Sequence, residues 1–491
     1  MNFSILIRIA FLSCWLIVFG LLLERDYFVK TIEVRETEIL KRGREESFMG
    51  IYFQGERIGY VKNRLYKTDN QTVALEQNAY MRLNILNESH PISMDVKAEL
   101  TDSFLLKHFD FKLSSPFYQM QAQGEVIGND VHFTLLTGKE EIKDIIRLKK
   151  PPFISTNQRA YLLKEGLKEG EKIKIPYFDP ISLSGKDTIM EYRGYEKKLI
   201  KGRVYKLHHF IETFSGVRIN SWIDDNGKVI QEESPAGFVF ISEPEFKATD
   251  IALKGKEILS AVSAPIIGRM PDITKLNAIQ YRLSYPEGAE VELDTDRQQL
   301  AGDMLTVTIE SLPAINSLPC SGYDNELAST PYIQSLNQAI TDQVSDLVDE
   351  NDPPLATARI ISEWVYNNLE KRPVLGIPDA LTTLSIKKGD CNEHAALFAA
   401  MARNAKIPTR IVAGVVYYDD AFYYHAWNEV CLDDRWISLD TTKNQFPADI
   451  SHIKFISGET KEMIKIGALL GKLTIEVMGT EDSLEQGKHP N

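Results

Sequence analysis

GDCNEHAALFAAMARN at residues 389–404 is followed by HAW at 425–427 and by Asp440. Cys391, His425 and Asp440 thus lie in one region, 34 and then 15 residues apart. The thiolate is the attacking form of cysteine, and a free thiol with a pKa near about 8.5 is mostly protonated at neutral pH. A histidine can remove that proton, and a carboxylate can orient the histidine. The three residues therefore predict a cysteine nucleophile with its base and its orienting carboxylate.

Residues 391–404 are expected to form a buried helix, because they are rich in Ala, Leu, Phe and Met and contain no Gly or Pro. Asp390 fits the N-cap position, and Glu393 completes a capping-box pattern three residues later. Cys391 then lies in the first turn, where unpaired N–H groups and the helix dipole favour an anion. We expect the acidity of its thiol to be enhanced.

The base and the carboxylate are expected on one hairpin. Residues 424–432 and 435–441 read as strands joined by a tight turn at Asp433-Asp434. This register sets Trp427 opposite Asp440, so His425 lies on the same sheet face as Asp440, one diagonal step away. A diagonal neighbour is roughly 7–8 Å distant, which a histidine and a carboxylate can bridge.

Each of these residues also has an ordinary structural interpretation. A lone cysteine in an Ala-rich helix is usually a small core residue, and a lone strand histidine is usually structural. A cysteine at a helix start, together with a strand histidine and a carboxylate on the same sheet face, favours a catalytic role. A zinc site made of Cys391, His394, His425 and Cys431 is disfavoured, because closely spaced ligand pairs are missing. We expect neither a metal nor a cofactor.

Other residues are weaker candidates for roles near the site. An oxyanion donor is expected besides the Cys391 backbone N–H. The side-chain candidates lie on an expected helix at about 356–371, and the sequence does not choose among Trp364, Asn367 and Asn368. His394 points along its own helix and is expected to support or pack rather than act as the base. Trp427 either shields the thiolate from water or belongs to the core.

Three segments carry a family resemblance: GDCNEHAALFAAMARNAKIPTRIVAGVVYY, HAWNEVCLDDRWISLDTT and PADISHIKF. Together they resemble the core of the bacterial transglutaminase-like superfamily, over residues 326 to about 455. The resemblance implies an α+β fold in which a helix packs on an antiparallel sheet, in the papain-like manner of cysteine proteases. It also implies that Cys391 is the nucleophile, His425 the base and Asp440 the orienting residue.

The N-terminus predicts a membrane anchor. Residues 9–23 are uncharged and mostly apolar, and no small-x-small cleavage site follows them. We therefore expect an uncleaved signal anchor, a single transmembrane helix within residues 1–25 that includes Cys14. The Lys/Arg count would keep the large domain in the cytoplasm, whereas the family resemblance implies export, and we expect a periplasmic catalytic domain. The remaining cysteines, Cys320, Cys391 and Cys431, suggest no disulfide framework.

The rest of the chain is expected to be rich in β-structure. The expected parts are a charged helical stalk at 26–47, an antiparallel β domain at 48–262, a second β segment and linker at 263–325, the catalytic domain at 326–478 and a disordered tail at 479–491. Alternating short apolar runs and polar turns between about 50 and 260 support the large β domain. The formal net charge of -13 argues against a nucleic-acid partner.

Two kinds of function remain open from the sequence. The first is a membrane-anchored thiol enzyme that forms a thioacyl intermediate with peptide or protein amides, and passes the acyl group to an amine or to water. The second is an anchored binding or scaffold module with little catalysis, whose β domain captures a cell-envelope partner. Neither the substrate nor the acyl acceptor can be identified from the residues.

Overall fold

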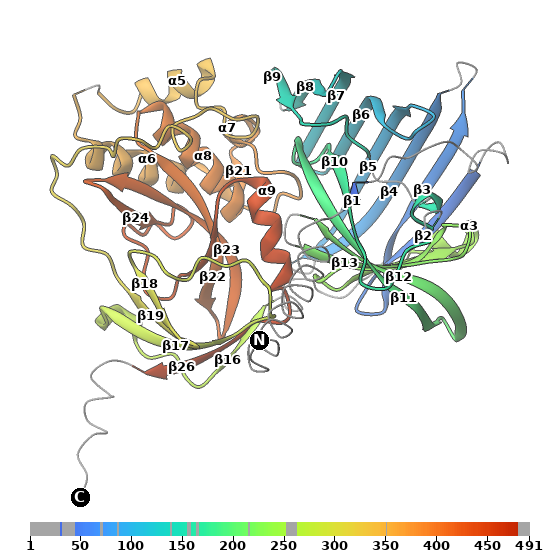
Figure 1. Ribbon diagram of the computed structural model, residues 1–491. Coiled ribbons are helices and arrows are strands. Elements are labelled where there is room, and N and C mark those ends of the chain that lie inside the picture. The colour runs from blue at the N-terminus through green and yellow to red at the C-terminus, as the bar shows by residue number, and fades with distance from the viewer. Residues whose placement is uncertain are drawn as a thin grey trace, which may run out of the picture.

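The computed structural model describes residues 30–31 and 45–479, apart from 69–71, 86–87, 138–139, 155–158, 164–165, 215–216, 252–262 and 350. The described chain forms a β-rich N-terminal half and a mixed C-terminal half that lie side by side (Figure 1). The predicted anchor at 1–25 lies outside the described residues. Within the described part, no helix combines the length and the apolar character needed to cross a membrane.

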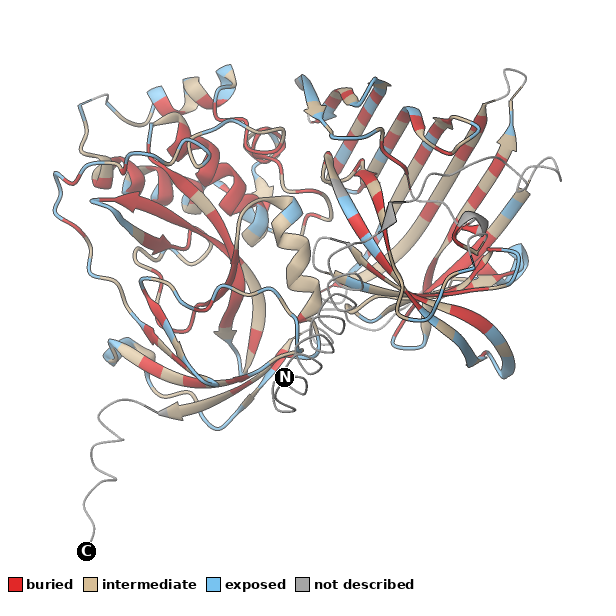
Figure 2. Ribbon diagram, viewed as in Figure 1, coloured by how far each residue is buried: buried red, intermediate tan, exposed pale blue. Residues whose placement is uncertain are grey.

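The N-terminal half is one nearly closed, curved sheet of 15 strands, in which β1 pairs in parallel with β10 and the other neighbours are antiparallel. Side chains alternate between its inner and outer faces, as the burial stripes in Figure 2 show. The strands are β1 (Lys30–Thr31), β2 (Glu45–Phe53), β3 (Glu56–Lys67), β4 (Val73–Ile85), β5 (Glu88–Leu100), β6 (Leu106–Ser115), β7 (Tyr118–Ile127), β8 (Asp130–Thr137), β9 (Glu140–Arg147), β10 (Lys172–Asp179), β11 (Ser184–Ile200), β12 (Arg203–Phe214), β13 (Val217–Ile223), β14 (Val229–Glu233) and β15 (Phe238–Glu243). The expected large antiparallel β domain is confirmed.

Two short helices accompany this sheet: α2 (Ala160–Leu163) and α3 (Glu245–Ala248). The expected helical stalk is wrong at both of its described ends. Lys30 pairs with Ile173 of β10, and Glu45 already belongs to β2. Pairing with the sheet satisfies these backbone groups, so tertiary contacts override the local helical preference of a charged sequence.

The C-terminal half packs helices against a nine-stranded sheet, in the order β18-β19-β17-β26-β16-β23-β22-β25 with β24 beside β23. Its strands are β16 (Ala264–Ile267), β17 (Ala278–Ser284), β18 (Gln298–Ala301), β19 (Met304–Thr308), β22 (Thr409–Tyr418), β23 (Ala421–Leu432), β24 (Arg435–Leu439), β25 (Ile453–Ser457) and β26 (Thr474–Gly479). Strand β16 pairs with both β23 and β26, so the second β segment and the closing strand share one sheet with the predicted catalytic hairpin.

The helices of this half are η2 (Ile273–Lys275), α5 (Gln338–Ser345), α6 (Pro354–Asn368), α7 (Ala380–Ile386), α8 (Cys391–Asn404), α9 (Thr460–Met463) and η3 (Ile464–Ala468). Helix α8 is central, and every residue from Glu393 to Arg403 is buried (Figure 2). The helix packs against β22, β23 and helices α5, α6 and α7. A small parallel pair, β20 (Glu370–Lys371) and β21 (Lys388–Gly389), links the end of α6 to the start of α8.

The two halves share a core next to the start of α8. Val374 and Ile377, on the loop before α7, pack within the hydrophobic cluster of the β-rich half. The ring of Tyr118 lies so close to Gly376 that a Cβ there would come within 2.3 Å of it. Thr137 and Thr382 hydroxyls hydrogen-bond across the junction at 3.1 Å. Because apolar packing and polar contacts combine here, the β-rich half is held against the loop that precedes α7 and leads on to α8.

Candidate active site

Helix α8 begins as the sequence predicts. Asp390 caps it by accepting from the Asn392 N–H at 3.0 Å, and Glu393 accepts from the Asp390 N–H at 2.9 Å. The preceding Gly389 has no space for a side chain, because a Cβ would lie 2.3 Å from that of Glu393. The predicted helix from Cys391 to Asn404 and its capping box are confirmed.

The hairpin register is also confirmed. Leu432 pairs with Arg435 across a two-residue turn in which Asp433 and Asp434 both have positive φ, at 50° and 56°. Such a turn matches the twist of antiparallel strands and suits Asp. The last pair of this ladder is Asn428 opposite Leu439. This register leaves His425 and Asp440 on the same face of the sheet, as expected.

His425 and Asp440 meet directly. The His425 Nε2 lies 2.8 Å from Asp440 Oδ2, which leaves Nδ1 free of this contact. Asp440 is fully buried, and its Oδ1 accepts from the backbone N–H groups of Thr442 at 2.7 Å and Lys443 at 3.2 Å. Although burial disfavours the charge of this carboxylate, the His425 imidazole holds the pKa of Asp440 well below its usual range. The carboxylate is therefore a fixed anion.

Cys391 faces the same hairpin. Its side chain is half-buried, and the backbone N–H of Ala426, next to His425, acts to lower the pKa of its thiol. Helix α8 is held on the strand by a second contact, in which the Asn428 amide donates to the Ala395 carbonyl at 3.0 Å. The helix start thus presents the sulfur to the strand that carries the base.

The expected acidity of Cys391 is wrong for the resting site. Burial first, and the Asp390 carboxylate second, raise the pKa of Cys391 well above its usual value, and the Ala426 N–H offsets this only in part. The physical reason lies in the cap itself. The carboxylate that satisfies the first N–H groups of α8 also repels a negative sulfur, so it counters the helix dipole.

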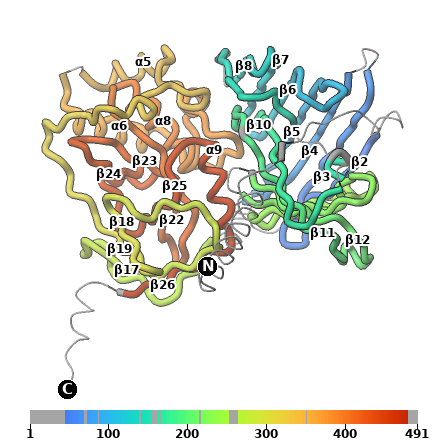
Figure 3. Tube along the Cα trace, in the orientation of Figure 1, coloured from blue at the N-terminus to red at the C-terminus, as the bar shows by residue number. Residues whose placement is uncertain are grey.

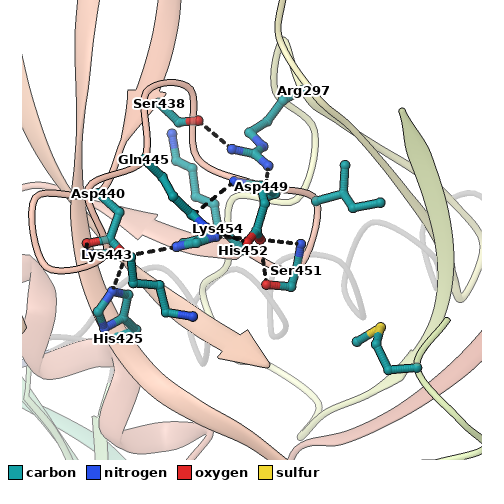
Figure 4. A network of polar contacts seen from close by, with 12 residues as sticks. Arg297, His425, Ser438, Asp440, Lys443, Gln445, Asp449, Ser451, His452 and Lys454 are labelled. Atoms are coloured by element: carbon teal, nitrogen blue, oxygen red, sulfur yellow. Dashed lines mark hydrogen bonds and ion pairs between the residues drawn. The ribbon is translucent and has the colours of Figure 1, made fainter. Parts of the chain in front are cut away.

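The sequence reasoning missed His452, which extends the site beyond Asp440. Its Nε2 lies 3.1 Å from Asp440 Oδ2, and its Nδ1 lies 3.0 Å from Asp449 Oδ1 (Figure 4). Ionised carboxylates only accept hydrogen bonds, so both ring nitrogens donate and the ring is an imidazolium. Although burial opposes this charge, the bonds to Asp440 and Asp449 raise the pKa of His452. The Asp449-x-x-His452 spacing within PADISHIKF was the available signal.

The network continues on the Asp449 side. Ser451 donates its backbone N–H to Asp449 at 2.9 Å, and Gln445 donates its amide at 2.8 Å. Arg297, which comes from the segment before β18, donates to the Asp449 carbonyl at 2.7 Å. Figure 4 shows this chain of contacts running from His425 inward. Arg297, which lies 152 positions before Asp449 in the chain, therefore supports the loop that orients the Asp440 carboxylate through His452.

The remaining predicted residues lie around the site in different surroundings. His394 is buried and uses Nδ1 to contact the Asp390 carbonyl at 2.7 Å. Trp427 is buried, and its ring stacks near His425 at a centroid distance of 6.2 Å. Trp364 is partly buried against the C-terminal core. Asn368 donates to the Trp364 carbonyl at 2.9 Å, and Asn367 is exposed. These positions assign no oxyanion donor.

One group in the site could hold a metal ion. Single ligand atoms from His425, Asp440 and His452 lie within 4.8 Å of one another, and such a set suits zinc. The hydrogen bonds described above place a proton between each imidazole and Asp440, so a metal would have to displace both protons. The zinc set considered from the sequence is not assembled, because Cys431 is bonded to another cysteine.

The expectation that the cysteines form no disulfide framework is also wrong. Cys320 and Cys431 are bonded, with their Cα atoms 5.4 Å apart. Cys320 lies on the long segment between β19 and α5, which runs over the outside of the C-terminal half (Figure 3). Backbone pairing of Pro319 with Leu432 brings this segment beside β23. The 111-residue separation hides this pair in the sequence.

Comparisons with known proteins agree with the fold of this region. A model of the transglutaminase-like superfamily matches residues 341–441. Mouse kyphoscoliosis peptidase is 28% identical over 141 residues, which cover 25% of this chain and only 20% of that protein.

Two solved structures resemble parts of the chain. A Cytophaga hutchinsonii candidate cysteine protease is 15% identical, covers 40% of this chain and 83% of its own, and has a TM-score of 0.28. A Brucella abortus β-barrel-like protein is 11% identical, covers 43% and 97%, and has a TM-score of 0.32. Scores this low support no functional argument. From the sequence match and the site geometry together, residues 341–441 are a domain of the transglutaminase-like superfamily.

Proposed function

We propose that this protein is a thiol enzyme, a cysteine peptidase or acyltransferase, in which Cys391 attacks the carbonyl of a peptide or protein amide. The observation that carries the proposal is the 2.8 Å contact between His425 Nε2 and Asp440 Oδ2 on the strand that Cys391 faces. Asp440 holds the imidazole so that its Nδ1 can accept the thiol proton. The likeness to kyphoscoliosis peptidase supports amide chemistry.

The chemical steps follow from these positions. His425 takes the thiol proton as the sulfur bonds to the carbonyl carbon, and the Cys391 backbone N–H donates to the developing oxyanion. His425 then gives the proton to the leaving amine, and a thioester remains. Water or a second amine attacks the thioester and releases the thiol. Because the resting thiol is not acidified, proton removal accompanies attack rather than preceding it.

We further propose that the enzyme is anchored by residues 1–25 with its catalytic half outside the cytoplasm. The apolar run at 9–23 supports the anchor. The Cys320–Cys431 disulfide supports the location, since disulfides persist in oxidising compartments and are rare in the cytosol.

The test is to incubate the full-length protein in detergent with β-casein and a fluorescent primary amine. Acyl transfer gives fluorescent casein, hydrolysis gives new peptide ends or free ammonia, and Cys391→Ala should abolish both. His425→Ala should lower either rate by at least about 100-fold, the usual contribution of a general base. Equal product formation by Cys391→Ala would overturn the proposal. No product from the wild type would favour the anchored binding module instead.

A further inference from the structure

The hairpin formed by β11 and β12 has an apolar tip backed by cations. Leu199 pairs directly with Val204, on either side of a turn in which Lys201 and Gly202 have φ of 48° and 81°. Leu199 is 68% exposed and Val204 is 64% exposed, whereas Ile200 points to the other face and is buried. Two large apolar side chains therefore protrude together at the end of the hairpin.

The hairpin tip itself is rich in cations, one of which, Lys198, is paired with Glu233 at 2.8 Å. Residues 197–206 contain five cations and no acid, in a chain with a net charge of -13. Lys197 pairs with Lys206 two positions behind Leu199 and Val204, so these lysines share the outward face with the apolar pair. Lys201 in the turn and Arg203 directly after it are both exposed. The outward face of the hairpin thus carries an exposed apolar pair at its tip, with basic side chains next to it.

Helix α3 adds a third exposed apolar side chain, Phe246, to those of Leu199 and Val204. The Lys201 ammonium lies 3.8 Å from the Tyr52 ring centroid, and the Tyr52 hydroxyl donates to Glu243 at 2.9 Å. Lys247 on α3 reaches the same Glu243 at 3.6 Å. Its neighbour Phe246 is 79% exposed, the highest value among the exposed large apolar residues of the described chain. The β11–β12 hairpin and helix α3 therefore both expose apolar side chains next to lysines. The two segments are linked by the contacts that Tyr52 and Glu243 make with Lys201 and Lys247.

We propose that this surface, defined by Leu199, Val204 and Phe246 with their flanking cations, contacts the headgroup region of an anionic lipid bilayer. A convex apolar tip can enter the boundary between headgroups and acyl chains, while lysine and arginine bind lipid phosphates. A protruding point offers no groove for a folded partner. The surface is separate from the triad, so it orients the protein on the membrane without taking part in the chemistry.

The test is hydrogen exchange on the full-length chain in nanodiscs of phosphatidylcholine alone and of phosphatidylcholine with phosphatidylglycerol. Amides of residues 197–206 should exchange more slowly in the anionic discs, and high salt should remove the difference. The paired change Lys201→Glu and Arg203→Glu should weaken this protection about fivefold or more for each charge. Leu199→Ser with Val204→Ser should also abolish it.

A matched control lies on the same sheet. The β7–β8 turn at Gly128 and Asn129 also exposes an apolar residue, Ile127 at 56%, but it is paired with Asp130 rather than with cations. Its amides should exchange equally in both discs. Equal exchange of residues 197–206 in the two lipids, or protection that survives both pairs of substitutions, would overturn the proposal. Cleavage or acyl transfer in detergent should be unaffected by these variants, which separates this proposal from the proposed function.

Discussion

The pKa of the Cys391 thiol depends on its neighbours as well as on its position at the start of α8. The first turn of a helix favours a thiolate, but burial and the Asp390 carboxylate raise the pKa of Cys391. In the proposed mechanism, His425 therefore removes the thiol proton during attack. The consequence can be measured without knowing the substrate.

The first prediction concerns alkylation of Cys391 by iodoacetamide. Its rate should keep rising beyond about pH 8.5, the ordinary pKa of a free thiol, because little thiolate exists at neutral pH. The measurement is a pH series with mass-spectrometric detection, and Cys391→Ser identifies the labelled residue. A plateau reached below pH 8 in the wild type and lost in His425→Ala would instead show a preformed ion pair, contrary to this expectation.

The second prediction concerns His452, whose pKa is raised by its two carboxylates. A raised folded-state pKa stabilises the fold fully below the unfolded value of about 6.5, and this stabilisation is lost as pH rises through the raised value. His452→Gln should therefore cost about 2 kcal/mol at pH 6 and less at pH 9, measured by chemical unfolding. His394→Gln is the control, since burial lowers the pKa of His394. Its cost should not grow toward acid pH.

At the scale of the element, the capping box of α8 influences both the stability of the helix and the pKa of Cys391. Asp390 both caps α8 and repels the thiolate, so the two roles can be separated by substitution. Asp390→Asn keeps a good cap and removes the charge, whereas Asp390→Ala removes both.

The third prediction follows from this separation. Both variants should alkylate Cys391 faster than the wild type at pH 7, but only Asp390→Ala should also lose about 1 kcal/mol of stability. Thermal unfolding and alkylation of the same samples provide the two measurements. Unchanged alkylation of Asp390→Asn would mean that the Asp390 charge does not control the thiol.

At the scale of the whole molecule, the disulfide closes a long loop around the site. Removing a cross-link over 111 residues releases considerable chain entropy in the unfolded state. Cys320→Ser together with Cys431→Ser should lower the free energy of unfolding by about 2–4 kcal/mol. Urea unfolding with and without reductant measures this, and reductant should not affect the double variant. Equal stability of oxidised and reduced wild type would contradict the prediction.

Local sequence determined the start of α8, its capping box and the register of the β23–β24 hairpin. These depend on interactions between residues a few positions apart, namely Asp390 with Glu393 and the Asp433-Asp434 turn, and they placed Cys391, His425 and Asp440 correctly. The resemblance to a known family agreed with that local pattern. Such features are readable because propensity, capping and strand alternation act over short distances.

Only the tertiary structure decided the rest. The pairing of Cys320 with Cys431, the contact of His452 with Asp440 and the support from Arg297 join distant segments that no local pattern relates. The pKa of Cys391 was misjudged for the same reason, because it depends on burial, which is a property of the packed molecule. The sequence thus predicted the segments that meet at the site, and the fold set the pKa of Cys391 and of Asp440, since charge in a protein interior depends on everything packed around it.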